Sequence, residues 1–298
     1  MTISEAVARA RQRLAAGGVP ADQAPGDAEV LARHVLGWDL ARYAAGLRDA
    51  VPAAFPDAYD ALIARRLRRE PVSQIVGHRE FWGLDFEVTR DVLTPRPETE
   101  LVVQAALDLW ASMGPWTYAD DYKPIVVDIG TGTGCIAIAL ATELPDARFI
   151  ASDASMPALV VARRNAARHG VAGRIAFRHT WQVPPENDVD MIVSNPPYVP
   201  RSQRESLMPE VRDFEPEIAL FGGEDGLDVY RALLEQSLGD LNAGGWLIIE
   251  VGYDQADEVR ALANPRYWEP GRTYTDLQGA ERVLTFRALS TAEEEVDE

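Results

Sequence analysis

Residues 125–142 read IVVDIGTGTGCIAIALAT, an apolar run that reaches a glycine-rich turn and continues into a second apolar run. Ile125–Ile129 is rich in β-branched residues, as buried strands are, and Cys135–Thr142 has the composition of a buried helix. Glycine in the turn lets the backbone approach a ligand closely, and the amides of the first helical turn are free to bind it. The stretch therefore predicts a strand–turn–helix unit with a ligand site at the turn.

The chain after this turn continues to alternate between strand and helix. Further strands are predicted at 148–152, 175–178, 191–194 and 246–251, helices at 157–169 and about 228–238, and a final hairpin at 272–274 and 282–287. Repeated βα units form largely parallel sheets with helices on both faces. The predicted fold class is therefore α/β, with a Rossmann-like, mostly parallel, seven-stranded sheet.

The first seventy residues have helical periodicity throughout. One helix is predicted from Ile3 to about Leu14, a second with Asp27 as its N-cap, and a third over about 55–69. Residues 81–88 alternate around a glycine, which predicts a β-hairpin. The predicted organisation is a helical bundle (1–73), a β-hairpin linker (74–95), an α/β catalytic domain (96–290) and a disordered acidic tail (291–298).

The charge balance argues against binding to nucleic acid. The 298 residues include 47 Asp and Glu against 29 Lys and Arg, a formal net charge of −18. Acidic and basic residues are equal in number over residues 1–90, so the excess lies in the rest of the chain. Proteins that hold nucleic acid by its phosphates depend on clustered cations. The densest basic cluster, Arg65, Arg66, Arg68 and Arg69, is interpreted as a solvated helix face; the alternative is a contact with an RNA-rich assembly.

Cysteine and histidine usage limits the cofactors and the compartment. Cys135 is the only cysteine, which excludes a disulfide framework, and we interpret it as a packing residue. The four histidines are scattered among different elements, so no metal is expected. The N-terminus lacks a signal-peptide pattern, and no apolar run approaches membrane-spanning length. We expect a cytoplasmic monomer with no membrane partner and no direct nucleic-acid partner.

The spacing of the glycines indicates which ligand the turn binds. A dinucleotide site has the pattern G-x-G-x-x-G, whereas the third glycine here is Gly134, one position too early. The Gly-Lys-Ser/Thr ending of a phosphate-binding P-loop is absent. Asp153 ends the next predicted strand, where a carboxylate can accept hydrogen bonds from both ribose hydroxyls. A nucleoside ligand is therefore predicted; the alternatives are a turn without ligand and an Asp153 that caps the following helix.

A second motif, Asn195-Pro196-Pro197-Tyr198, follows the predicted strand 191–194. Ligands of open parallel sheets lie beyond the carboxyl ends of the strands, so this motif and the glycine turn should face one another. An amide nitrogen is a poor nucleophile that needs orientation more than a base. The Asn195 side-chain oxygen and the Pro196 carbonyl can accept its two N–H bonds, and Tyr198 can pack against the planar amide. The alternative is an Asn-Pro turn with a buried tyrosine.

These motifs and several others resemble those of the peptide chain release factor glutamine N5-methyltransferases, which are class I S-adenosylmethionine-dependent enzymes. The resemblance covers nearly the whole chain. It includes Pro71–Gly77 (PVSQIVG), Glu80–Leu84 (EFWGL), Thr94–Glu100 (TPRPETE), Asn195–Tyr198, Glu215-Pro216, Gly222–Leu227 (GGEDGL), Gly244-Gly245, Glu250–Gly252 (EVG) and Asp276–Gly279 (DLQG). The TPRPETE segment and the run from Glu215 to Leu227 are its most specific parts.

The resemblance implies a reaction and a set of site residues. The substrate would be the glutamine of the Gly-Gly-Gln loop of class I release factors, methylated on its side-chain nitrogen, and the helical domain would help to dock the factor. Asn195, Pro196, Pro197 and Tyr198 would hold the glutamine, with Asn195, Pro196 and Tyr198 as the catalytic set. The S-adenosylmethionine site would comprise Gly130, Thr131, Gly132, Thr133, Gly134, Asp153 (ribose), Trp181 (adenine) and Asn195.

Four other functions remain open at this point. A glutamine methyltransferase of a ribosomal protein would share nearly all the catalytic motifs. An amino-methyltransferase of a nucleic-acid base would share the Asn195–Tyr198 tetrapeptide, because it also suits an exocyclic nitrogen. The intact motifs disfavour a silent adaptor that binds the translation machinery, and the glycine spacing disfavours a nicotinamide oxidoreductase.

Overall fold

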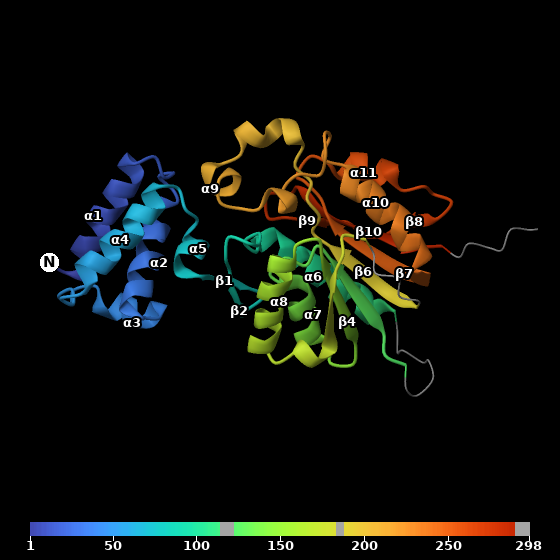
Figure 1. Cartoon of the computed structure of the whole chain (residues 1–298), viewed down its shortest axis with the longest axis horizontal. Coiled ribbons are helices and arrows are strands. Elements are labelled where there is room, and N and C mark those ends of the chain that lie inside the picture. The colour runs from blue at the N-terminus through green and yellow to red at the C-terminus, as the bar shows by residue number, and fades with distance from the viewer. Residues whose placement is uncertain (114–121, 183–187, 290–298) are drawn as a thin grey trace, which may run out of the picture. The chain divides into compact units, whose positions relative to one another are not determined.

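The protein is described by a computed structural model, which places residues 1–113, 122–182 and 188–289 (Figure 1). The acidic tail predicted at 291–298 lies outside these residues. The chain divides into two compact units. Unit 1 comprises Met1–His78 together with Met208–Phe214, and unit 2 comprises Arg79–Leu207 and Glu215–Glu298.

Unit 1 is a small bundle of helices around one apolar core. Its helices are α1 (Ile3–Ala16), α2 (Ala24–Leu36), α3 (Leu40–Gly46), α4 (Phe55–Leu67), α5 (Val72–Val76) and α9 (Pro209–Arg212). Helix α1 begins with a capping box: Thr2 Oγ1 accepts from the Glu5 N–H, and the Glu5 carboxylate accepts from the Thr2 N–H. Ile3, Leu14, Leu31 and Ile63 are fully buried in the core.

The prediction that Asp27 caps the second helix is wrong. Helix α2 begins three residues earlier, at Ala24, with Pro25 in its first turn, where proline is well tolerated. Asp27 instead lies inside that turn and accepts a hydrogen bond of 2.7 Å from Arg66 Nε. Part of the predicted hairpin linker also differs, since residues 72–76 form α5.

The interpretation of the arginine cluster as a solvated face is also wrong for three of its four members. Arg66 is only 2% exposed and pairs with Asp27 and, at 2.8 Å, with Glu210 of the 208–214 segment. Arg69 pairs with the other oxygen of Glu210 at 2.6 Å. Arg65 pairs with Glu70, and Arg68 is the exposed member. Acidic partners thus bury Arg66 in unit 1 and hold Arg65 and Arg69 in ion pairs at partly exposed positions.

Unit 2 begins with the predicted hairpin. Strands β1 (His78–Phe81) and β2 (Leu84–Glu87) form a separate two-stranded sheet. Trp82 and Gly83 connect them, both with positive φ (54° and 70°), as a two-residue hairpin turn requires. The loop that follows contains a single 3₁₀ turn, η1 (Pro97–Thr99), and leads into α6 (Glu100–Ser112).

The main sheet has eight strands within the described part of the chain, in the order β5-β4-β3-β6-β7-β10-β8, with β9 paired to β10. The strands are β3 (Ile125–Ile129), β4 (Arg148–Asp153), β5 (Ile175–His179), β6 (Val189–Ser194), β7 (Leu241–Glu250), β8 (Trp268–Pro270), β9 (Tyr274–Thr275) and β10 (Glu281–Ala288). Strands β3 to β7 are parallel and β10 is antiparallel to β7. The sheet has one strand more than predicted, because the three-residue β8 ends in a proline and leaves no alternating pattern.

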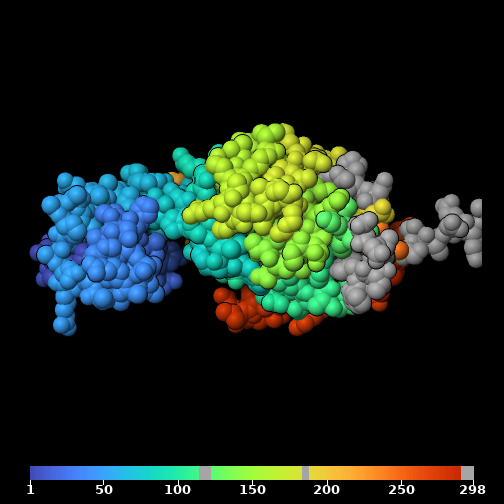
Figure 2. Space-filling model, turned by 90° about the horizontal axis from the view of Figure 1, so that it is seen from below, coloured from blue at the N-terminus to red at the C-terminus, as the bar shows by residue number. Residues whose placement is uncertain are grey.

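Helices cover both faces of this sheet (Figure 1). Helices α6 and α7 (Cys135–Glu143) share one apolar cluster with Val126, and α10 (Asp228–Gln236) and α11 (Ala256–Leu262) share another with Val127. Neighbouring residues of β3 thus point to opposite faces. Helix α8 (Met156–Arg168) belongs to the yellow-green segment, which is exposed on the face of the molecule that Figure 2 shows. Within the described ranges, no helix has the length and apolar character needed to cross a bilayer.

Candidate functional site

The glycine turn joins β3 to α7 in a conformation that requires glycine. Gly130, Gly132 and Gly134 have φ values of 73°, 55° and 84°, which side chains rarely adopt. The N–H groups of Gly130 and Thr131 both donate to the Ser152 carbonyl at 2.9 Å, which fixes the turn against the end of β4. Gly134 is the N-cap of α7 and has no side chain that could occupy the first helical amides. The turn therefore brings bare backbone to the carboxyl edge of the sheet, where a ligand can approach it closely.

Hydrogen bonds to a buried polar side chain stabilise this turn. Asp128 is buried, and its Oδ2 accepts from Thr131 Oγ1 at 2.6 Å and from the Ala137 N–H at 3.3 Å. Burial raises the pKa of Asp128 to about 7. Thr131 and Thr133 are buried as well. Sequence reasoning missed this bracing role of Asp128, although the residue opens the glycine motif.

Asp153 connects the turn to the end of β4. Its Oδ2 accepts from the Gly132 N–H at 2.9 Å and its Oδ1 from the Ser155 N–H at 2.8 Å. Ser155, and not Asp153, caps α8, because Ser155 Oγ accepts from the Ala158 N–H. Burial raises the pKa of Asp153, and the two backbone hydrogen bonds oppose the rise. A carboxylate has about four acceptor positions, so Asp153 can still accept from a ligand.

The structure brings the tetrapeptide Asn195–Tyr198 beside the glycine turn. Strands β3 and β6 pair in parallel with Ile129 opposite Ser194, and Ser194 Oγ donates to the Ile129 carbonyl at 2.7 Å. A Cβ atom added at Gly130 would lie 3.9 Å from the Asn195 carbonyl oxygen. Asn195 Nδ2 donates to Thr99 Oγ1 at 3.0 Å. The two motifs therefore end side by side at one edge of the sheet.

The segment that contains Gly222 and Gly226 supports the backbone of the tetrapeptide. A Cβ atom at Gly222 would lie 2.4 Å from the Pro197 carbonyl oxygen, and one at Gly226 would lie 2.3 Å from that of Tyr198. The Tyr198 carbonyl also accepts from Gln255 Nε2 at 3.1 Å. Glycine is required at both positions because only a bare backbone fits so close to these carbonyls. The glycines of the GGEDGL motif were the signal in the sequence, but their contact with the tetrapeptide was not predicted.

Replacing Gly222 by alanine is expected to lower the free energy of unfolding of unit 2 by about 1–3 kcal/mol, because the new methyl group would overlap a carbonyl that cannot move alone. Urea denaturation measures the change. Gly239→Ala is the matched control, since no atom lies within 4 Å of its added Cβ. If Gly222→Ala were as stable as Gly239→Ala, the described approach to Pro197 would be wrong.

A cavity of about 630 Å³ opens where the two motifs meet. Of the predicted site residues, its wall includes Gly130, Gly132, Asp153, Trp181, Asn195, Pro196 and Pro197. Trp181 is 61% exposed there. The side chain of Tyr198 instead packs against the apolar cluster beneath α10 and α11. Thr131, Thr133 and Gly134 lie behind the wall, where they shape the turn.

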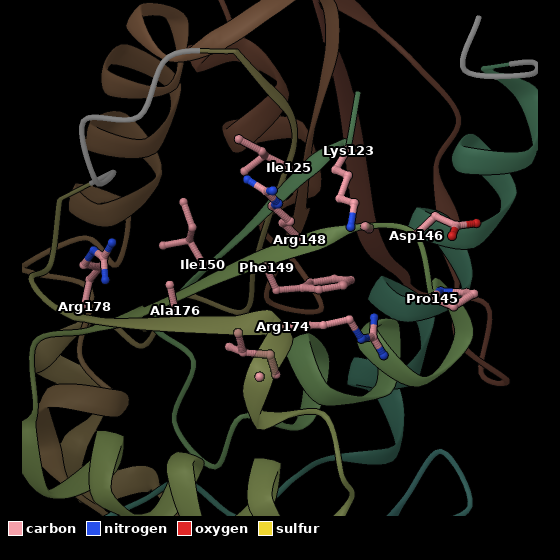
Figure 3. A pocket seen from close by; sticks show the side chains of 13 residues that line it. Lys123, Ile125, Pro145, Asp146, Arg148, Phe149, Ile150, Arg174, Ala176 and Arg178 are labelled. Atoms are coloured by element: carbon pink, nitrogen blue, oxygen red, sulfur yellow. The ribbon is translucent and has the colours of Figure 1, made fainter. Parts of the chain in front are cut away.

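A second cavity, of about 550 Å³, lies toward the amino ends of β3, β4 and β5 (Figure 3). Lys123, Arg148, Arg174 and Arg178 contribute to its lining. Arg174 also has a structural role, because its guanidinium donates to the Leu144 carbonyl at the end of α7 at 2.9 Å. None of the predicted site residues lies on this wall. We therefore place the functional site at the carboxyl edge, where the motifs converge.

Comparisons with known proteins find a family match for each of the two parts of the chain. Residues 5–77 match the family model described as the PrmC N-terminal domain, and residues 118–210 match the methyltransferase small domain. The release factor glutamine methyltransferase of Cereibacter sphaeroides is 42% identical over 288 residues, which cover 96% of this chain and 99% of the relative. The protein of that name from Koribacter versatilis is 38% identical, again over 96% and 99% of the two chains.

Solved structures share the fold at low sequence identity. The catalytic domain of hMettl16, in complex with a MAT2A 3′UTR hairpin, matches with a TM-score of 0.56 and 16% identity, over 76% of this chain and 81% of that one. A methyltransferase from Pyrococcus furiosus matches with a TM-score of 0.50 and 17% identity, over 75% and 96%. The α/β fold with a mostly parallel sheet is thus that of known methyltransferases.

Proposed function

The chain belongs to the family of release factor glutamine methyltransferases, and from this premise we propose that it methylates the glutamine of the Gly-Gly-Gln loop of class I release factors. The methyl group comes from S-adenosylmethionine and is transferred to the side-chain amide nitrogen. The observation that carries the proposal is the position of Asn195 and Pro196, an acceptor pair for an amide, on one cavity wall with the glycine turn.

The residues of the carboxyl edge fit S-adenosylmethionine. The turn Gly130–Gly134 offers bare backbone that the cofactor can approach closely, and Asp153 keeps acceptor capacity for ribose hydroxyls. Trp181 offers an exposed aromatic face for adenine, and Asn195 borders the same cavity. When bound, the cofactor supplies an electrophilic methyl group on a sulfonium centre.

The protein's own contribution to the reaction is orientation. Asn195 Oδ1 and the Pro196 carbonyl accept the two N–H bonds of the substrate amide, which aims the nitrogen lone pair at the methyl carbon. The bound cofactor would supply the methyl group from its sulfonium centre, whose sulfur would keep the electron pair of the broken C–S bond. The methylated nitrogen then releases its extra proton to water. Proline at 196 and 197 keeps the carbonyls fixed because its φ is locked.

The helical unit supplies the remaining part of the proposal. Residues 1–73 dock the release factor, and the catalytic domain, from residue 96 onward, acts on the loop that the factor presents. The protein acts as a monomer in the cytoplasm, with no direct contact to nucleic acid. The excess of acidic over basic residues supports a protein substrate.

A methyl-transfer assay with labelled S-adenosylmethionine tests this function against its alternatives. The expected result is label in a purified class I release factor, and none when the glutamine of its Gly-Gly-Gln loop is replaced by alanine. Ribosomal proteins and RNA are offered in parallel reactions. Label in either of these, with an unmodified release factor, would contradict the proposed substrate.

A further inference from the structure

The loop that carries TPRPETE is held tightly beside the tetrapeptide. Arg96 pairs at 2.5 Å with Glu215, whose other oxygen accepts from the Thr94 N–H at 3.3 Å. Glu100, at the far end of the loop, accepts from the Trp82 N–H at 2.8 Å. The TPRPETE and Glu215-Pro216 motifs are thus two halves of one structure. Between these anchors lies Thr99, which is only 2% exposed.

Thr99 is the hydrogen-bond partner of Asn195. Asn195 Nδ2 donates to Thr99 Oγ1 at 3.0 Å, across 96 residues of sequence. No residue in the described part of the chain hydrogen-bonds to the Asn195 side-chain oxygen. The contact therefore occupies the NH₂ end of the carboxamide and leaves the acceptor end available.

Glu250, at the end of β7, is a buried acidic neighbour of Thr99. The carboxyl group is buried, and its Oε2 has no partner among the described residues. Burial raises the pKa of Glu250 to about 7; the hydrogen bond from Thr99 and the charges of Arg282 and Arg96 oppose the rise, and Glu98 adds to it. An ionised carboxylate is an acceptor only.

A hydroxyl group has one proton and two acceptor lone pairs. When the Thr99 proton points to Glu250, only the acceptor side remains for Asn195, so the carboxamide must present its NH₂ group to Thr99. Without this constraint, the hydroxyl could donate to a flipped carboxamide, whose NH₂ group would then face the N–H bonds of the substrate.

We propose that Thr99, which accepts from Asn195 Nδ2 and gives its own proton to Glu250, is a positioning residue that fixes the Asn195 carboxamide with its oxygen toward the substrate amide. This inference rests on the proposed role of Asn195. It assigns a task to the last threonine of TPRPETE and to the glutamate of EVG, which the cofactor and substrate sites leave unexplained. It also makes the site selective for a group that donates two hydrogen bonds, such as a primary amide.

Steady-state kinetics with the release factor, together with calorimetric titration of S-adenosylmethionine, test the inference. Thr99→Val keeps the shape of the side chain and removes the hydroxyl, and should lower kcat by about 10- to 100-fold with unchanged cofactor affinity. Thr99→Ser restores the hydroxyl and should recover most of the turnover. Thr285→Val is the matched control, because Thr285 is also buried and donates at 2.8 Å to the Arg272 carbonyl, but does not border the cavity.

Three outcomes would overturn the inference. The first is turnover by Thr99→Val as fast as that by Thr285→Val, the second is a failure of Thr99→Ser to recover turnover, and the third is a loss of cofactor affinity in Thr99→Val in proportion to turnover. Asn195→Ala separates this inference from the proposed function. An inactive Asn195→Ala beside a fully active Thr99→Val rejects only the role of Thr99, whereas an active Asn195→Ala rejects the proposed mechanism itself.

Discussion

Replacing Asn195 by alanine is expected to lower kcat by about 10²–10³-fold, as the loss of one preorganised hydrogen-bonding group at a reacting centre does. The reason is that the substrate nitrogen loses one of the two acceptors that orient it, and orientation is the main contribution of this site. The affinity for S-adenosylmethionine should stay largely intact although Asn195 borders its cavity, because the glycine turn and Asp153 are held by backbone hydrogen bonds that do not involve the Asn195 side chain.

Single-turnover kinetics and cofactor titration measure these two effects separately. Asn242→Ala is the control, because Asn242 also makes a side-chain hydrogen bond in unit 2, to Asp190 at 3.1 Å, away from the cavity. It should turn over at the rate of the unchanged protein. Equal losses of cofactor affinity and turnover in Asn195→Ala would show that the residue is structural, and the orientation mechanism would fail.

Replacing Arg66 by alanine is expected to destabilise unit 1 by about 3–5 kcal/mol, the usual result of removing one partner from a buried ion pair. Arg66 lies between Asp27 and Glu210, at 2.7 and 2.8 Å. Its loss leaves Asp27 half-buried without its hydrogen bond and leaves Glu210 with Arg69 alone. Burial raises the pKa of Asp27, whereas that of Glu210 is lowered because hydrogen bonds from Arg69 and Arg66 outweigh the opposing effect of its burial.

Hydrogen exchange of the slowest amides in α2 and α4 measures this loss directly, because these amides report the opening of unit 1. Arg68→Ala is the matched control on the same helix end, and its exposed side chain predicts a change within about 0.5 kcal/mol. Equal exchange rates in the two variants would contradict the buried position of Arg66.

The βα units could be predicted from the sequence to within a few residues. Each apolar run from Ile125 to Ser194 is short and closed by a polar residue or glycine, and the runs of β3 and β6 are also rich in β-branched residues. Such signals are local. Helix α3 was missed for a local reason too. It has only seven residues, and its one start signal is Asp39, whose side chain accepts from the Arg42 N–H at 2.7 Å.

Contacts between distant residues could not be predicted. The arginines at 65–69 have the composition of a solvated face, and only the segment 208–214, about 140 positions later, brings Glu210 to Arg66 and Arg69. Neither composition nor periodicity indicates that residues 208–214 belong to unit 1 while the residues on either side of them belong to unit 2.

In the candidate site, too, the features with local sequence signals could be predicted and the contacts between distant residues could not. The glycine turn, Asp153 and the tetrapeptide could be placed at one edge of the sheet, since the carboxyl ends of parallel strands always share an edge. The support of this edge could not be predicted, because the contact of Thr99 with Asn195 and that of Gly222 with Pro197 depend on how loops fold over the sheet.

The central claim, methylation of an amide nitrogen, is tested most directly by tandem mass spectrometry of a class I release factor after incubation with the protein and S-adenosylmethionine. We predict one added methyl group, mapped to the side-chain nitrogen of the glutamine in the Gly-Gly-Gln loop. A methyl group on any other residue or atom, or an unmodified factor in the presence of bound cofactor, would contradict the account.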